Sequence, residues 1–214
     1  MSDLEFFFDP VCPFAWITSR WVVEVQGLRS YDVDWRFISL AIINEHRVGT
    51  EDWYTPEYRA GHVAGTRALR VADQVRLTAD NAAVGALYTA LGNAIHRDGR
   101  RQELRDDTLG LIRAALITAG LDPALAEHAD DESHDVHLRS ETELAFSRTG
   151  KDVGTPILTF RPGSDHEGSF FGPVISRAPR GDDALKLWDA VETIATTSSL
   201  AELKRSNRAP LDFS

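Results

Sequence analysis

The sequence predicts an α/β protein in which a long helical segment separates two parts that contain β-strands. Three observations predict this class. An apolar run over residues 4–9 leads through a tight turn into a helix start, which is typical of a buried strand followed by a helix. The segment 56–149 carries helical apolar patterns and no convincing strand. Strand character then returns at residues 154–160.

The first part of the chain has the order strand, helix, strand. Residues 4–9 form the first strand, and a helix follows Cys12 with apolar residues at three- and four-residue steps until Gly27. Residues 33–38 alternate apolar and polar and predict a second strand, which the apolar residues 39–43 are expected to extend. A right-handed crossover would make the two strands parallel.

The middle of the chain is predicted to be helical. Residues 45–60 are polar and favour a loop or a short helix. The apolar spacing after them predicts five helices, at residues 56–75, 81–97, 106–119, 123–128 and 133–149.

The last part returns to strands and ends in helices. Residues 154–160 form a strand, and the short apolar segment 168–176 is expected to pair back on it. Asp182 is placed to cap a long helix. A capping box at residues 199–202 predicts a last short helix, and the polar tail from Ser206 is expected to be loose.

Composition and charge exclude several classes of function. The 214 residues are 43% hydrophobic, which is ordinary for a globular protein, and the formal net charge is −10. Nucleic acid is therefore not expected as a partner, because phosphate binding requires a basic surface. No run of about 18 apolar residues predicts a membrane span. The acidic N-terminus lacks the basic segment of a secretory signal, so we expect a cytoplasmic protein.

Cys12 is the only cysteine of the chain, and it stands between a turn and a helix start. Pro13 suits the first turn of a helix, where the dipole and free N–H groups lower the pKa of a thiol. A strand followed by Cys-Pro-x-x and a helix is the beginning of a thioredoxin-type fold. The usual motif there is C-x-x-C, but Ala15 replaces the second cysteine. An intramolecular disulfide is therefore excluded, and thiol chemistry must pass through a bond to another molecule.

Three stretches of sequence carry a resemblance to a known family. They are residues 9–16 (DPVCPFAW), residues 18–21 (TSRW), and residues 171–174 (FGPV) together with Leu187-Trp188. With the order of elements, they resemble the DsbA-like branch of the thioredoxin superfamily, and most closely the mycothiol-dependent reductases and nitroreductases of actinobacteria. The resemblance implies a discontinuous thioredoxin-like domain at 1–45 and 150–214, with a helical domain inserted at 46–149.

The same resemblance implies the composition of the site. Thr155-Pro156 matches the position at which this fold has a cis proline beside the nucleophile, where the preceding residue aligns an incoming substrate. Pro13, Phe14 and Trp16 are then expected to contact the substrate or the thiol. The implied co-substrate is a low-molecular-weight thiol such as mycothiol, and no tightly bound cofactor is expected.

Three functions stay open at this level. The leading hypothesis is a monothiol oxidoreductase in which Cys12 forms a mixed disulfide with a disulfide or electrophilic substrate. The second is a transferase or isomerase of the kappa glutathione transferase type, which activates a bound thiol cofactor and uses serine where Cys12 stands. The third is a non-catalytic binding protein. The sequence allows a homodimer but does not identify the substrate, the small thiol or the redox direction.

The histidines invite a metal interpretation. His134 and His137 are three residues apart and follow the acidic residues 130–132, so they could share a helix face. No second pair of ligands has matching spacing, and acidic residues at a helix start favourably complement its dipole. The sequence therefore predicts no metal site.

Overall fold

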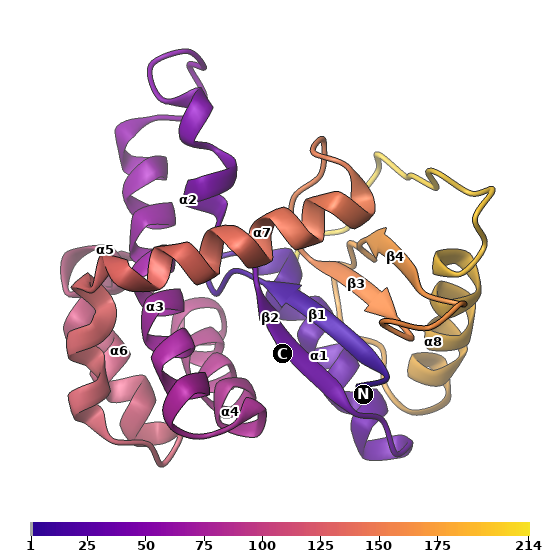
Figure 1. Ribbon diagram of the computed structural model, residues 1–214, viewed down its shortest axis with the longest axis horizontal. Helices are drawn as coiled ribbons and strands as arrows, with labels where there is room; N and C mark the ends of the chain where they lie inside the picture. Colours follow the sequence, from indigo (N-terminus) through magenta and orange to yellow (C-terminus); the bar gives the residue numbers. More distant parts are fainter. Residues whose placement is uncertain (1) are drawn as a thin grey trace.

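The computed structural model describes residues 2–214 and contains a mixed four-stranded sheet with helices on both faces (Figure 1). The strand order is β2-β1-β3-β4. β1 (Leu4–Phe8) pairs in parallel with β2 (Val33–Phe37) and antiparallel with β3 (Ile157–Phe160). β3 pairs antiparallel with β4 (Gly168–Phe171). The α/β class is confirmed, and the two ends of the chain build one sheet.

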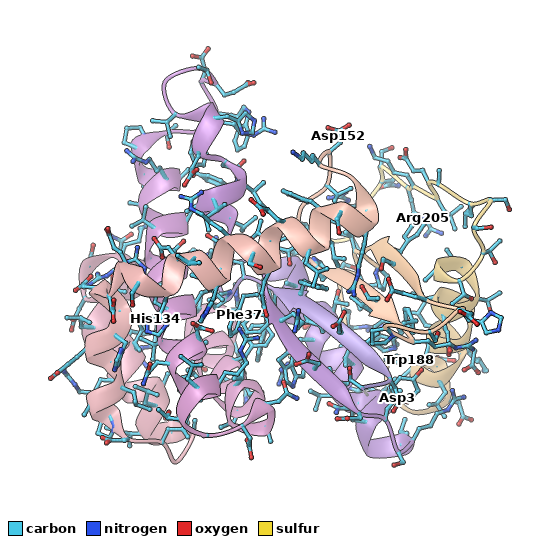
Figure 2. All side chains as sticks on the ribbon, viewed as in Figure 1. Asp3, Phe37, His134, Asp152, Trp188 and Arg205 are labelled. Carbon is cyan, nitrogen blue, oxygen red and sulfur yellow. The ribbon has the colours of Figure 1, made fainter. Side chains whose placement is uncertain are left out.

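β1 is apolar at almost every position because both faces of the sheet are covered. Its five residues are all buried, and successive side chains of a strand point to opposite faces. Phe6 and Phe8 join the main core, whereas Phe7 belongs to a second cluster on the other face with Ile38 and Ala145. On the main-core side, Trp188 (Figure 2) packs edge-on against β3, and its ring centroid lies 5.3 Å from that of Phe160.

The long segment between β2 and β3 is helical, as its periodicity predicts. In chain order the helices of the protein are α1 (Pro13–Leu28), α2 (Leu40–Ile43), η1 (Glu45–Arg47), α3 (Pro56–Thr78), α4 (Asn81–Gly92), the π-helical turn η2 (Asn93–Arg97), α5 (Arg101–Asp106), α6 (Thr108–Thr118), the 3₁₀ turns η3 (Pro123–Asp130) and η4 (Glu132–His134), α7 (Asp135–Thr149) and α8 (Gly181–Ala195). Among the described residues, none of these helices is long and apolar enough to cross a bilayer.

Four local predictions were wrong. Asp182 does not cap α8, because the helix begins at Gly181 with Arg180 as its N-cap and Asp182 lies within the first turn. Residues 39–43 do not extend β2 but turn into α2, because the Ser39 hydroxyl accepts a hydrogen bond from the Ile42 N–H and caps a helix. Residues 199–202 form no helix. The tail beyond Ser206 is not loose: Leu211 packs against the main core, and its neighbour Asp212 donates a backbone hydrogen bond to the Ser176 carbonyl at 2.8 Å.

α7 belongs to the helical segment in sequence but lies against the sheet (Figure 1). Its Glu141 carboxylate accepts a hydrogen bond from the Phe37 N–H on β2 at 2.7 Å, and its Thr142 hydroxyl accepts one from the Ser39 N–H at 3.2 Å. The helix thus covers one face of the sheet, while α1 and α8 pack on each other and on the main core. The domain boundaries at residues 45/46 and 149/150 stay a prediction.

Candidate active site

Cys12 is the N-cap residue of α1, which places its sulfur at the start of the helix. Its backbone N–H donates to the Asp9 carbonyl at 3.0 Å, which closes the turn after β1, and Pro13 occupies the first helical position. The Cys12 Sγ accepts a hydrogen bond from the Ala15 N–H at 3.4 Å. The sulfur therefore takes the position that a serine or aspartate oxygen occupies at an ordinary N-cap.

Thr155 and Pro156 face the sulfur from the opposite side. The Cys12 thiol donates to the Thr155 carbonyl, with Sγ and O 3.3 Å apart. The Thr155-Pro156 peptide bond is cis, which confirms the expectation from the sequence. The Thr155 hydroxyl donates to the Phe7 carbonyl at 2.9 Å and so ties this segment to the end of β1. The two halves of the site are thereby fixed to one strand.

Asp9 holds the turn that carries Cys12. Its carboxylate is fully buried and accepts hydrogen bonds from the Val11 N–H at 3.0 Å and the Leu40 N–H at 2.8 Å. Burial raises the pKa of Asp9 to about 7, against the opposing effect of these two N–H groups. α3 passes so close that a Cβ at Gly65 would lie 2.7 Å from the Asp9 carboxylate oxygen. Sequence patterns alone did not distinguish Asp9 as a site residue.

Two side chains of the helical segment hold the same turn from outside. The ring nitrogen Nε2 of His96 lies 2.8 Å from the Pro10 carbonyl, and the Arg101 guanidinium donates to the Val11 carbonyl at 3.0 Å. Burial lowers the pKa of His96 to about 4, so its ring is neutral and its Nε2–H is the donor. Sequence reasoning missed both residues, because no local pattern predicts a contact between residues that are about 90 positions apart in the sequence.

The Cys12 thiol itself is buried, with 6% of the residue exposed. Burial, with a smaller contribution from the charge of Asp9, raises the pKa of Cys12 to about 12 against the opposing effect of the Ala15 N–H. The expectation of a thiol with a lowered pKa is therefore wrong for this arrangement of the site. Removal of water outweighs one long N–H···S hydrogen bond at the helix start.

The other predicted contact residues divide into two groups. Pro13 and Phe14 are half-buried and reach the surface beside Cys12. Trp16 is 1% exposed and stacks on His96, with ring centroids 6.0 Å apart. We therefore leave Trp16 out of the substrate surface, because its side chain lies in the core.

The C-terminal tail borders the site, which the sequence did not predict. The Arg208 guanidinium lies over the Phe14 ring at 5.4 Å, and the Phe213 ring stacks on His96 with centroids 5.7 Å apart. Both contacted residues adjoin the Cys12 turn. Leu211 and Phe213, the apolar residues after a polar run, were the signal in the sequence that this tail packs.

Comparisons with known proteins agree with this architecture. A curated relative from Mycobacterium tuberculosis, the "Uncharacterized protein Rv2286c", is 29% identical over 99% of this chain and 85% of its own length. A crystal structure described as a "putative protein disulfide isomerase from Nitrosomonas europaea" superposes with a TM-score of 0.55 at 16% identity, over 87% of this chain and 95% of that chain. This likeness shows a shared DsbA-like thioredoxin fold.

The family assignment comes from a sequence profile. The profile described as "Rv2466c-like: Mycothiol-dependent nitroreductase Rv2466c" matches residues 11–205, which include Cys12, the cis Thr155-Pro156 pair and the whole helical segment. The chain therefore belongs to the Rv2466c-like mycothiol-dependent nitroreductase family, a family of thiol-dependent oxidoreductases.

Proposed function

We propose that this protein catalyses thiol–disulfide exchange with Cys12 as its single nucleophile. The proposed co-substrate is a low-molecular-weight thiol, with mycothiol as the favoured candidate. One observation carries the proposal: the Cys12 sulfur lies between the Ala15 N–H and the Thr155 carbonyl. Ala15 supports the single-cysteine route, because no second thiol exists in the chain to resolve an intermediate. The reducing cytoplasm suits such chemistry and is the location we propose.

The reaction is balanced in two exchanges. The Cys12 thiolate attacks one sulfur of a disulfide R–S–S–R′, which forms the mixed disulfide of Cys12 with R–S and releases R′–S⁻. A second small thiolate then attacks the R sulfur of the mixed disulfide and releases the Cys12 thiolate. In each exchange one S–S bond breaks and one S–S bond forms, so no other oxidant or reductant is needed.

The buried thiol must be uncovered before it reacts. In the structure, the buried Cys12 thiol donates its proton in a hydrogen bond to the Thr155 carbonyl. Because only the thiolate is nucleophilic, the thiol must lose this proton before it can react. Water or substrate entering beside Phe14 would lower the desolvation cost and let the proton pass to solvent. The Thr155 backbone carbonyl would then be free to align the incoming disulfide in place of the thiol.

A second candidate function is favoured by the same buried thiol. A neutral S–H that donates a hydrogen bond can orient the thiolate of a bound cofactor, which is the role a serine fills in thiol-dependent transferases and isomerases of the kappa type. In that case Cys12 never forms a disulfide. Cys12→Ser would keep activity in the transferase and lose it in the oxidoreductase.

The experiment is intact-mass measurement after incubation with oxidised mycothiol and, separately, with oxidised glutathione. We expect the native protein to gain the mass of one small-thiol molecule, as a mixed disulfide with Cys12. This adduct should disappear when the reduced thiol is added, and it should not form on Cys12→Ala. Denatured protein serves as the control that the reagents react with the free thiol. A native protein that forms no adduct with either disulfide at pH 7–9, although the denatured chain does, would contradict the disulfide route.

A further inference from the structure

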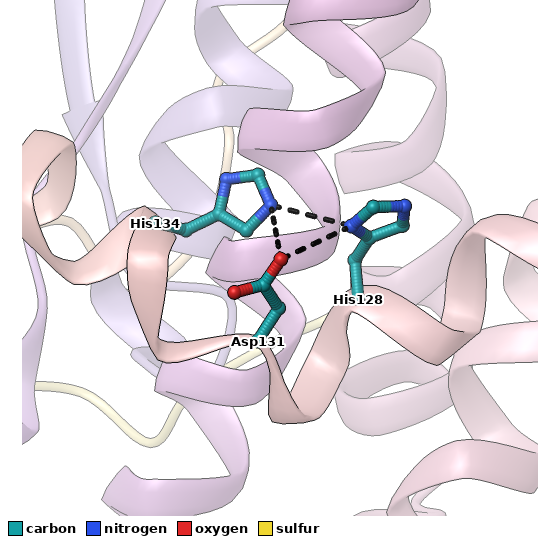
Figure 3. Close-up of side chains that lie close together, drawn as sticks. All are labelled: His128, Asp131 and His134. Atoms are coloured by element: carbon teal, nitrogen blue, oxygen red, sulfur yellow. Dashed lines mark hydrogen bonds and ion pairs between the residues drawn. The ribbon is translucent and has the colours of Figure 1, made fainter.

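Three side chains of the helical segment, none of which takes part in the Cys12 site, converge on one another (Figure 3). They are His128 near the end of η3, Asp131 between the two 3₁₀ turns, and His134 at the end of η4. Their facing atoms are His128 Nδ1, Asp131 Oδ2 and His134 Nε2, all within 4.8 Å of one another. Sequence spacing pairs His134 with His137, whereas the folded chain brings His128 to His134 instead.

The three atoms are spaced for a shared ion more than for hydrogen bonds. The two histidine nitrogens are 3.4 Å apart, and Asp131 Oδ2 lies 3.7 Å from the His128 nitrogen and 3.9 Å from the His134 nitrogen. Ordinary hydrogen bonds between such groups are shorter, at about 2.7–3.2 Å. A circle through three points with these separations has a radius of about 2.1 Å, so an ion in the plane of the three atoms would lie at a zinc–ligand distance. Tetrahedral zinc needs ligand atoms about 3.3–3.4 Å apart, so the Asp131 oxygen must move a few tenths of an ångström towards the two nitrogens.

A buried carboxylate on α3 fixes the tautomer that a metal requires. Asp73 is 1% exposed and accepts hydrogen bonds from His134 Nδ1 at 2.8 Å and from the Arg76 guanidinium at 2.9 Å. Because the carboxylate accepts at Nδ1, the proton of a neutral His134 is on Nδ1 and the lone pair of Nε2 points into the cluster. A histidine whose second nitrogen donates to a carboxylate is the usual arrangement at protein metal sites.

The remaining two ligands are oriented and able to adjust. Asp131 Oδ1 accepts the Ser133 N–H at 3.0 Å, and Oδ2 is the oxygen that faces the two histidines. The side chain of His134 is 6% exposed, whereas those of His128 and Asp131 are 34% and 44% exposed. One rigid, buried ligand therefore meets two surface ligands that can close by a few tenths of an ångström, and solvent can supply a fourth ligand.

We propose that His128, Asp131 and His134 form a binding site for a divalent transition-metal ion, with Zn²⁺ as the expected occupant, and that Asp73 is its positioning residue. Two imidazoles and one carboxylate suit zinc, whereas calcium and magnesium prefer oxygen ligands. The ion would join η3 to η4 at the start of α7. No residue of the cluster belongs to the Cys12 site, so the proposal is independent of the proposed function.

His137 provides a matched control. Its Nδ1 lies 3.0 Å from the same Asp73 oxygen as His134 Nδ1, but its side chain is 56% exposed and it is not a member of the cluster. His137→Ala removes a histidine from the same carboxylate and leaves the three proposed ligands in place. His128→Ala and Asp131→Asn each remove one surface ligand without opening the buried core.

The experiment titrates the native protein and the three variants with Zn²⁺ by calorimetry and with Co²⁺ by absorbance. Wild-type protein and His137→Ala should bind one ion, and His128→Ala and Asp131→Asn should each weaken binding at least about tenfold. The Co²⁺ spectrum should show d–d bands without a sulfur-to-cobalt band, which separates this site from Cys12. Zn²⁺ at a hundredfold excess over the dissociation constant should raise the melting temperature of the binding-competent proteins by about 5–10 °C.

Two results would overturn the assignment. One is a wild-type protein that binds neither ion at up to about 100 μM, which corresponds to weaker than −5.5 kcal/mol of binding free energy. The other is equal binding by wild-type protein and by either ligand variant, which would show that the ion is held elsewhere. Circular dichroism of each variant checks that it is folded before the comparison is made.

Discussion

At the scale of single residues, the site is dominated by the cost of removing charge from water. Cys12 has the helix start that lowers the pKa of a thiol, yet its burial and the neighbouring Asp9 raise that pKa. Asp9 shows the same balance, since its two N–H donors do not offset its complete burial. Desolvation therefore keeps the Cys12 thiol protonated near neutral pH, and its chemistry depends on opening of the site.

Asp9 gives a pH-dependent prediction. Its pKa is about 7 in the folded protein and about 3.9 in an unfolded chain. Because the folded state keeps this proton to higher pH than the unfolded chain does, the contribution of Asp9 to stability is fully present below pH 4 and is lost as the pH rises to about 7. Relative to wild type, Asp9→Asn should therefore gain a few kcal/mol in free energy of unfolding between pH 4 and pH 7.5.

The measurement is urea unfolding of both proteins at a series of pH values. Only the change of their difference with pH is read, because the lost hydrogen bonds of Asp9→Asn add an offset that does not depend on pH. A difference that stays flat from pH 4 to pH 7.5 would show that Asp9 is ionised throughout and that its burial is less complete than the structure indicates.

At the scale of elements, the C-terminal tail packs beside the Cys12 turn, where it contacts the start of α1 and His96. The tail contacts Phe14 through Arg208 and His96 through Phe213. His96 in turn binds the Pro10 carbonyl. Residues 201–210 of the tail are exposed, and the tail is attached through a few side chains such as Leu211 and Phe213, so it should open more easily than the core.

Phe213→Ala should make Cys12 more reactive. Loss of the stacking contact on His96 would favour the open tail by about 1.4 kcal/mol, which is a tenfold increase in the open population. The alkylation rate of Cys12 at pH 8, measured by intact mass, should rise by about the same factor. Leu203→Ala is the matched control, since Leu203 lies in the same tail with 74% of its surface exposed. Equal rates in all three proteins would show that the tail does not limit access.

At the scale of the whole molecule, the helical segment covers one of the two edges of the sheet. β2 is an edge strand, and unpaired edges favour aggregation. Asn81 on α4 accepts the Trp35 N–H at 2.8 Å and donates to the Val33 carbonyl at 2.6 Å. Glu141 on α7 accepts the Phe37 N–H. The helices thus supply partners for three outward backbone groups of β2 and attach the two parts of the fold to each other.

Glu141→Ala should destabilise the whole protein. The Glu141 carboxylate also accepts a hydrogen bond from the Arg76 guanidinium at 2.9 Å. Its removal leaves the Phe37 N–H without its acceptor and leaves Arg76 paired with Asp73 alone. We expect a loss of about 2 kcal/mol in the free energy of unfolding, measured by urea denaturation. Glu143→Ala, an exposed position on the same helix, should change it by less than about 0.5 kcal/mol. Equal effects would assign the loss to the helix itself.

The sequence by itself determined the features that local chemistry dictates. The apolar run of β1, the Cys12-Pro13 helix start and the periodicity of the helical segment each follow from neighbouring residues, so their elements could be predicted. The cis bond at Thr155-Pro156 was predicted by resemblance to the family. The composition alone excludes an internal disulfide, because Cys12 is the only cysteine of the chain and Ala15 stands where a second one would be expected.

Only the tertiary structure decided what surrounds these residues. The burial of the Cys12 sulfur depends on distant groups, such as Thr155 in the segment just before β3. The pairing of His128 with His134, and the anchoring of His134 by Asp73, likewise join turns and helices that no local pattern connects. The desolvation of Cys12 and the convergence of the histidine side chains are properties of the folded chain, because both depend on which segments pack against each other.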